Sequence, residues 1–280
     1  MSSTYLEAAA RRSADAACGP ARTAAVGQGW CEYFINEQQA SATRSVAEAV
    51  ACSHSVLLLE SLATSDECAA LTSEGSRLAR VELHERAMLE ECGLLDDTME
   101  HDAGRVRMHV RDRLGNTGQA ICDLVLVRAL RAIDRMEGAA ASFRFGGWLA
   151  ATHACLDNEA LLWSPGEPAV NVYAPGGEFK PHEDEQTLSI LVPLTDGANF
   201  SGGGTAFWRL DSRGHEDEQA QRSTNGDPAL VLVPPAGAAI IFGGQLTHAA
   251  LPVLSGERCI LVGSCSPASD VVMMRRVATV

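Results

Sequence analysis

The sequence predicts a mainly β domain with supporting helices, an α+β arrangement whose strands form a sandwich or barrel. From about residue 142 onward, short apolar runs alternate with turn residues, which is typical of these β folds. Residues 119–136 carry apolar side chains at helical spacing, so they predict an amphipathic helix that lies against a sheet. A chain of 280 residues with 46% hydrophobic side chains can also bury a sizeable core.

The individual elements follow from the same patterns. The apolar run at residues 55–60 predicts the first strand. Thr64 and Glu67 form a capping-box pattern that predicts the start of the next helix. The charged residues 82–99 are also expected to be helical. The later strands are expected at residues 142–150, 168–174, 179–184, 187–195, 204–209, 229–233, 237–242, 246–252 and 257–264.

The chain is predicted to hold one large domain, residues 54–280, preceded by a helical N-terminal extension, residues 1–53. The extension is rich in Ala, Ser and Gln and is expected to form helices at residues 5–17 and 43–52. No internal repeat longer than four residues interrupts this division. The sequence gives no indication of the oligomeric state.

Basic side chains alternate with other residues between positions 102 and 118. Alternation with a period of two indicates a strand with one basic face. We favour an exposed edge strand, and the alternative is a strand whose basic face reaches toward an anionic substrate. The alternating residues are Arg105, Arg107, His109, Arg111 and Arg113.

The net charge and the cysteine content indicate which classes of partner and which cellular compartment to expect. The formal net charge of −14 opposes binding to nucleic acid, and no polybasic or membrane-length apolar segment favours a membrane. Nine scattered cysteines without Cys-x-x-Cys pairs indicate free thiols in a reducing compartment. We therefore expect a cytoplasmic protein that binds neither nucleic acid nor a membrane; an organelle transit peptide is the alternative.

The most informative stretch is residues 170–184, in which two apolar runs flank a Pro-Gly-Gly turn. His182 and Asp184 lie two residues apart in the second run, so both side chains project from the same face of a strand. His248 and Arg258 follow downstream in or beside further apolar runs. Two histidines and one carboxylate with open coordination positions suit non-haem Fe(II) and oxygen chemistry.

The tetrapeptide His-Glu-Asp-Glu occurs at residues 182–185 and again at residues 215–218. The second copy follows a polar, glycine-containing stretch without strand alternation, so it is interpreted as a surface loop. His215 is therefore expected to be a solvated residue, with a place in a lid over the site as the alternative. The metal ligands are assigned to the first copy.

At these residues the sequence resembles the 2-oxoglutarate- and Fe(II)-dependent dioxygenases, in particular the prolyl 4-hydroxylase-like branch. The resemblance covers about residues 55–267 and depends on five features in order. They are Tyr173 before His182, the His-x-Asp pair, the Gly-Gly-Gly-Thr-Ala-Phe run at residues 202–207, the strand entry Pro-Pro-Ala-Gly-Ala-Ala-Ile-Ile-Phe at residues 234–242, and His248 with Arg258. The family fold implies a double-stranded β-helix, or jelly roll, at about residues 142–267.

The resemblance also implies cofactors and roles. Fe(II) would be held by His182, Asp184 and His248, with 2-oxoglutarate and O₂ as co-substrates. Arg258 would bind the distal carboxylate of 2-oxoglutarate, because guanidinium is always charged and pairs with carboxylate bidentately. Prolyl 4-hydroxylases usually carry Lys at this position, so Arg258 is a departure. Tyr173 and Ser189 would supply further hydrogen bonds to 2-oxoglutarate.

Substrate residues are less well defined by the sequence. Asn171 shares a strand face with Tyr173, and Trp208 follows the glycine run, so either could line the pocket or pack in the core. The loops at residues 196–203 and 209–228 are candidates for a lid. Further substrate candidates are Arg105, Arg107 and Trp163.

The expected activity is oxidation, most simply hydroxylation, of an aliphatic C–H of an amino-acid-like substrate, free or as a peptide-bound prolyl residue. Succinate and CO₂ would be released. Desaturation or ring closure by the same chemistry is an alternative outcome. A non-catalytic sensor of metal or 2-oxoglutarate, and a Zn(II) hydrolase, are the alternatives from other functional classes.

Overall fold

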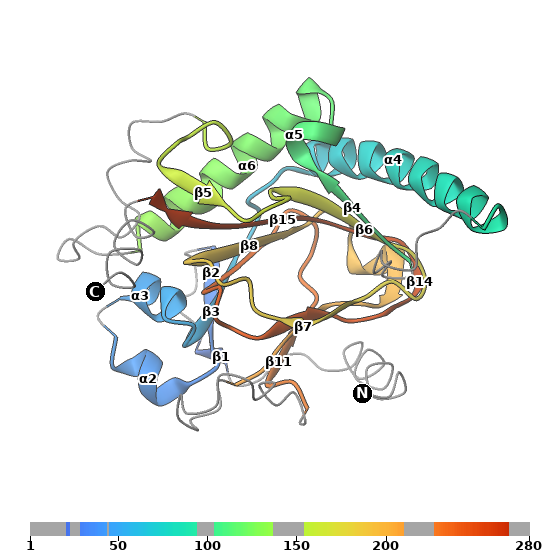
Figure 1. The fold of residues 1–280 in the computed structure, drawn as a ribbon. Coiled ribbons are helices and arrows are strands. Elements are labelled where there is room, and N and C mark those ends of the chain that lie inside the picture. The colour runs from blue at the N-terminus through green and yellow to red at the C-terminus, as the bar shows by residue number, and fades with distance from the viewer. Residues whose placement is uncertain are drawn as a thin grey trace, which may run out of the picture.

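The structure, a computed structural model, describes residues 21–22, 29–43, 45–93, 104–136, 154–209 and 227–268. These residues form three layers: helices on one side, a large sheet in the middle and a smaller sheet on the other side (Figure 1). None of the helices in the described ranges combines the length and the apolar character needed to cross a bilayer.

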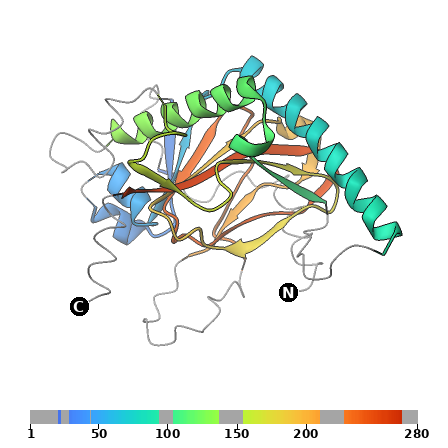
Figure 2. The same cartoon turned by 45° about the horizontal axis from the view of Figure 1, so that its top comes forward.

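Two long helices, α4 (Ser65–Glu91) and α6 (Asn116–Asp134), cover the outer face of the larger sheet, as the turned view also shows (Figure 2). The predicted capping box is present at the start of α4, because Thr64 and Glu67 exchange side-chain-to-backbone hydrogen bonds of 2.8 and 3.2 Å. The helix continues to Glu91, so the charged residues from position 82 extend it. The shorter helices are α2 (Glu37–Ser41), α3 (Val46–Ala51), α5 (Val110–Arg113) and the 3-10 helix η1 (Gly197–Asn199).

In the described residues, the larger sheet has nine strands in the order β1-β2-β3-β12-β8-β15-β6-β4, with β5 beside β15. Every pair in it is antiparallel. Its strands are β1 (Ala21–Arg22), β2 (Trp30–Phe34), β3 (Ser55–Leu59), β4 (Arg105–His109), β5 (Leu161–Trp163), β6 (Ala169–Tyr173), β8 (Leu188–Pro193), β12 (Ala239–Phe242) and β15 (Arg258–Pro267).

The smaller sheet has the order β11-β10-β13-β7, and β14 pairs with β9 in a separate two-stranded ribbon. These strands are β7 (Phe179–His182), β9 (Phe200–Gly202), β10 (Thr205–Phe207), β11 (Leu230–Leu232), β13 (His248–Ala250) and β14 (Val253–Gly256). From β6 onward the chain crosses repeatedly between the sheets, with β6, β8, β12 and β15 in the larger one and β7, β10, β11 and β13 in the smaller one. This topology is the predicted double-stranded β-helix, so the predicted fold class is confirmed.

The larger sheet separates two hydrophobic cores, as the alternation of side chains along β15 illustrates. Cys259 and Leu261 belong to the core between the sheet and the helices, whereas Ile260 and Val262 belong to the core between the two sheets. Several side chains of the core between the sheets also form the wall of the pocket described below.

The structure also contains elements that the sequence did not predict. β2 pairs with β3, so part of the segment assigned to the N-terminal extension belongs to the larger sheet. The predicted basic strand is β4, at the edge of the larger sheet. Val106 and Met108 pack under the helices, so Arg107 lies on the opposite face, where it lines the pocket described below, whereas Arg111 and Arg113 fall in α5. The helix predicted at residues 5–17, the strand predicted at residues 142–150 and His215 lie outside the described residues.

Candidate metal centre

The two candidate histidine ligands lie opposite each other in the smaller sheet. β7 ends at His182, β13 begins at His248, and the two residues are paired in the antiparallel register. Their ring centroids are 4.3 Å apart. Two residues separated by 66 positions in the sequence are therefore brought together by a single strand pairing.

A glycine turn returns the chain from the larger sheet to β7. Gly176 has a φ of +85°, a left-handed conformation that side chains rarely adopt. A Cβ atom at Gly177 would collide with the carbonyl oxygen of Gly104, at the start of β4. The Pro-Gly-Gly sequence thus permits the close backbone approach that places His182 on the smaller sheet.

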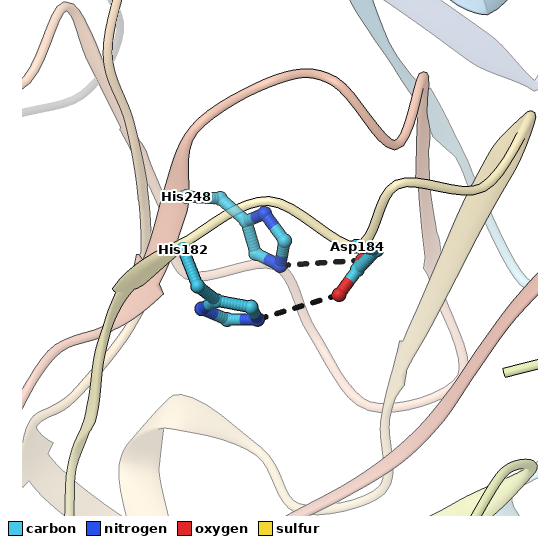
Figure 3. Close-up of side chains that lie close together, drawn as sticks. All are labelled: His182, Asp184 and His248. Carbon is cyan, nitrogen blue, oxygen red and sulfur yellow. Dashed lines mark ion pairs between the residues drawn. The ribbon is translucent and has the colours of Figure 1, made fainter. Parts of the chain in front are cut away.

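Asp184 completes the cluster from the loop after β7. Its Oδ1 lies 3.3 Å from Nε2 of His182, and its Oδ2 lies 3.5 Å from Nε2 of His248 (Figure 3). Ligand atoms at about 2.1 Å from one metal ion are separated by about 3–3.5 Å, so these spacings fit a shared ion. Within the described ranges, His182, Asp184 and His248 form the one group of three or more His, Cys, Asp or Glu residues close enough to share a metal.

The backbone fixes the orientation of both imidazole rings. Nδ1 of His182 lies 2.8 Å from the carbonyl oxygen of Lys180, and Nδ1 of His248 lies 3.0 Å from that of Leu246. A carbonyl oxygen accepts only, so each Nδ1 carries a proton, and Nε2 is the ring nitrogen that faces Asp184. Both Nε2 atoms are therefore directed to the place that a metal ion beside Asp184 would take.

Asp184 is held by its own backbone and by Ser189. Its amide donates to the carbonyl oxygen of Gly244 over 2.9 Å, and the Ser189 hydroxyl donates to Asp184 Oδ2 over 2.5 Å. A Cβ atom at Gly244 would collide with the backbone of Gln186, so glycine is needed at this crossing. These contacts fix the carboxylate before any ligand binds.

Burial and neighbouring charges set the protonation of the cluster. Burial opposes ionisation of Asp184, but the hydrogen bond with His182 and the charge of His248 outweigh it and lower its pKa to about 2. Burial lowers the pKa of His248 to about 4, against the opposing attraction of Asp184. Near neutral pH, Asp184 is therefore an anion and His248 is neutral, which are the forms that bind metal.

Arg258, at the start of β15, is only 3% exposed. Its Nη2 donates to the Thr205 hydroxyl over 3.0 Å, whereas its Nη1 is buried without a hydrogen-bond partner. Its guanidinium carbon lies 5.5 Å from the centroid of the Tyr173 ring. No carboxylate in the described parts of the chain forms an ion pair with Arg258.

One pocket between the sheets connects these groups and encloses about 450 Å³ of space, its open mouth included. The sequence-predicted residues that line it are His182, Asp184, His248, Arg258, Tyr173, Ser189, Asn171 and Arg107. The structure thus brings together the predicted metal ligands and the predicted 2-oxoglutarate residues.

Other predicted residues lie differently. Trp208 is not among the lining residues and packs with Ala206, Ala249 and Leu251. Trp163 packs against the core between the helices and the larger sheet. Arg105 does not line the pocket. Its guanidinium carbon lies 3.7 Å from the centroid of the ring of Phe179, and Phe179 lines the pocket.

Sequence reasoning missed three polar residues of the pocket, Thr205, Glu167 and Ser264. Thr205, the partner of Arg258, ends the glycine run on which the family resemblance partly depends, and this was a usable signal. Glu167 also lines the pocket, and its position before Pro168 in a polar loop gave no signal.

Comparisons with known proteins give structural similarity only. No family model and no curated protein matches the sequence. A prolyl-4-hydroxylase from Pseudomonas putida is 19% identical, over 79% of this chain and 99% of that one, with a TM-score of 0.42. HygX from Streptomyces hygroscopicus, with nickel, 2-oxoglutarate and hygromycin B bound, is 12% identical over 76% of this chain and 83% of that one, with a TM-score of 0.48.

A third similar structure is SnoK, a non-heme alpha-ketoglutarate-dependent carbocyclase from nogalamycin biosynthesis. It is 13% identical over 82% of this chain and 86% of that one, with a TM-score of 0.48. At these values the comparisons carry no residue roles to this chain. The functional proposal below depends on the side chains of the chain itself.

Proposed function

We propose that this protein is an Fe(II)- and 2-oxoglutarate-dependent oxygenase that oxidises an aliphatic C–H of an amino-acid-like substrate. The observation that carries the proposal is that one pocket contains both a candidate metal site and a buried cation. One is the His182, Asp184 and His248 cluster, and the other is Arg258, a buried guanidinium without an acidic partner among the described residues.

An unpaired buried cation is costly, because it loses its hydration without gaining a counter-ion. A carboxylate of a bound ligand would compensate Arg258, and the Thr205 hydroxyl beside it could donate to the same group. The other end of that ligand would reach the metal cluster. 2-Oxoglutarate fits both demands, because it carries a 2-oxo acid at one end and a carboxylate at the other.

The ligand set fits iron better than a closed structural metal site. Two neutral imidazoles and one carboxylate on one side of an ion leave positions open for other ligands. When bound there, Fe(II) with 2-oxoglutarate and O₂ would supply the oxidation of a C–H bond, with release of succinate and CO₂. A hydrolytic metal site would have no need of the buried cation Arg258.

The chain's own residues would hold and shield the reactants. Thr205 and the Tyr173 ring position the Arg258 guanidinium, which would fix the far carboxylate of 2-oxoglutarate. The Ser189 hydroxyl is directed to Asp184, so we assign it to orienting the carboxylate ligand instead of binding 2-oxoglutarate. Leu191 and Ile260 add apolar wall that excludes water from the pocket.

The substrate is proposed to be a free amino acid or a peptide-bound prolyl residue. Hydroxylation is the simplest outcome, and desaturation or ring closure would use the same residues. The test is release of labelled CO₂ from 2-oxo[1-¹⁴C]glutarate by the Fe(II)-loaded protein in air. We expect release that requires Fe(II), O₂ and Asp184; equal release by Asp184→Ala would contradict the proposal.

A further inference from the structure

The pocket contains a second polar cluster that neither the metal ligands nor Arg258 use. It consists of Arg107, Glu167, Asn171 and Ser264, all of which line the same pocket as His182 and Asp184. Arg107 on β4 and Asn171 on β6 are directly paired in the sheet, so their side chains lie side by side on its inner face. Ser264 on β15 is paired with Ser189, whose hydroxyl contacts Asp184.

Glu167 organises this cluster. Its Oε1 accepts a hydrogen bond from Arg107 Nη2 over 2.6 Å, and its Oε2 accepts from both the amide and the hydroxyl of Ser264 over 2.5 Å. Its side chain is only 8% exposed, whereas that of Arg107 is 29% exposed. The carboxylate therefore acts as a fixed anchor that orients Arg107 within the pocket wall.

Arg107 keeps unused donors. A guanidinium carries five N–H groups, and Glu167 takes one hydrogen bond from Arg107 in the described residues. The remaining donors suit a carboxylate, which guanidinium pairs with bidentately. An anchored arginine loses little conformational freedom when such a ligand binds, so its donors are preorganised.

Asn171 supplies the complementary acceptor. The residue is 2% exposed, its Oδ1 is buried without a hydrogen-bond partner, and its Nδ2 makes only a long 3.5 Å contact with the Tyr173 hydroxyl. Leaving a buried polar atom unpaired costs about 1–3 kcal/mol. A ligand with an N–H group in this corner would remove that cost.

We propose that Arg107, Glu167 and Asn171 form the substrate subsite and recognise the head group of a free α-amino acid. The substrate carboxylate pairs with Arg107, and its amino group donates to Asn171 Oδ1 and to the remaining acceptor capacity of Glu167 Oε1. This inference rests on the proposed function and narrows its substrate class from amino-acid-like molecules to free amino acids.

Charge balance favours a zwitterion over other ligands. The Arg107–Glu167 pair has no net charge but places a donor-rich cation and a carboxylate side by side. A phosphate would gain from Arg107 but would be repelled by Glu167. A prolyl residue within a peptide has neither a free carboxylate nor an N–H at its own backbone.

The test uses the twenty protein L-α-amino acids one at a time, with binding followed by ligand-observed saturation-transfer NMR. Protein is used both alone and loaded with Fe(II) and 2-oxoglutarate without oxygen. We expect at least one amino acid to bind, and its carboxamide and N-acetyl derivatives to bind about 10-fold more weakly or worse. Binding of none, or equal binding of the carboxamide, would overturn the subsite.

Variants locate the effect. Arg107→Gln should weaken binding of that amino acid by about 10-fold or more, Arg107→Lys should restore part of it, and Asn171→Leu should weaken it independently. Arg111→Gln is the matched control, because Arg111 is more exposed and pairs with Asp157 outside the pocket. Unchanged binding by folded Arg107→Gln or Asn171→Leu would overturn the assignment.

The same samples separate this inference from the proposed function. Fe(II) and 2-oxoglutarate binding should be retained in Arg107→Gln, because Arg258 and the metal ligands are untouched. Failure of the wild-type protein to bind 2-oxoglutarate would contradict the proposed function. If 2-oxoglutarate binds but the amino acid binds no better than its carboxamide, only the subsite is contradicted.

Discussion

Ser189 donates a hydrogen bond to Asp184 over 2.5 Å, from the second residue of β8 to the loop after β7. The acceptor, Oδ2, also faces His248, while Oδ1 faces His182. One hydroxyl on the larger sheet thus sets the rotation of a carboxylate whose two histidine partners are on the smaller sheet. The metal centre joins the two sheets, and its geometry depends on both.

Removing this hydroxyl should weaken metal binding. Ser189→Ala frees the Asp184 carboxylate to rotate, and loss of such outer hydrogen bonds typically costs about 10–100-fold in metal affinity. We expect an increase of that size in the dissociation constant for Fe(II) or Mn(II), measured by anaerobic calorimetry. Ser201→Ala, at an exposed serine on β9, is the control and should bind metal like the wild type. Equal affinity in Ser189→Ala would show that the backbone alone fixes Asp184.

Arg258 should control 2-oxoglutarate binding without controlling metal binding. Truncating one partner of a buried charge pair typically costs about 2–5 kcal/mol, so Arg258→Gln should raise the dissociation constant for 2-oxoglutarate by about 30-fold or more. Arg258→Lys keeps the charge and should retain part of the affinity. Calorimetric titration of each metal-loaded variant with 2-oxoglutarate measures these affinities. If Arg258→Gln bound 2-oxoglutarate like the wild type, Arg258 would have no role in binding it.

Acid should destabilise the metal-free protein through His248. Burial lowers its pKa from 6.5 to about 4, so between these values the unfolded chain binds a proton that the folded chain does not. Stability therefore falls as the pH is lowered through this window, in which Asp184 stays ionised because its pKa is about 2. We expect a smaller decrease in Tm from pH 6.5 to 4 for His248→Leu than for the wild type in EDTA.

His84→Gln is the control for that comparison, because His84 lies exposed on α4. Its Tm should follow the wild-type curve across the same pH range. Parallel curves for His248→Leu and the wild type would contradict the role of His248.

Buried cysteines should resist alkylation. All eight cysteines in the described residues are free thiols. Burial raises the pKa of Cys122 and of Cys265 to about 12 and that of Cys68 to about 11, so the reactive thiolate is scarce at pH 8. Iodoacetamide labelling followed by mass spectrometry should modify exposed Cys92 first and these three only after unfolding. Rapid labelling of Cys122 or Cys265 in native protein would contradict the packing of this core.

The sequence predicted what depends on local pattern. The Thr64 cap, the amphipathic helix α6 and most strands of the β-helix were readable, because capping and side-chain period are local properties. The metal ligands could be predicted from the sequence because His182 and Asp184 are two residues apart and the family pattern indicated His248.

The rest required long-range information. β2 became a strand through pairing with β3, and the three-residue strand β5 exists through pairing with β15. The direction of the Ser189 hydroxyl and the lack of a partner for Asn171 Oδ1 are set by residues that meet only in the fold. Glu167 had no sequence signal, because its partners lie 60 and 97 positions away.

The central claim is that one pocket holds a metal ion and 2-oxoglutarate together, and anaerobic titration of the metal-free protein tests it most directly. Fe(II) is added first and 2-oxoglutarate second, while the visible metal-to-ligand charge-transfer absorption is followed. We predict a band that appears only with both ligands, is lost in Asp184→Ala and is weakened in Arg258→Gln. Iron binding without any band on addition of 2-oxoglutarate would contradict the claim and favour a hydrolase or a metal sensor.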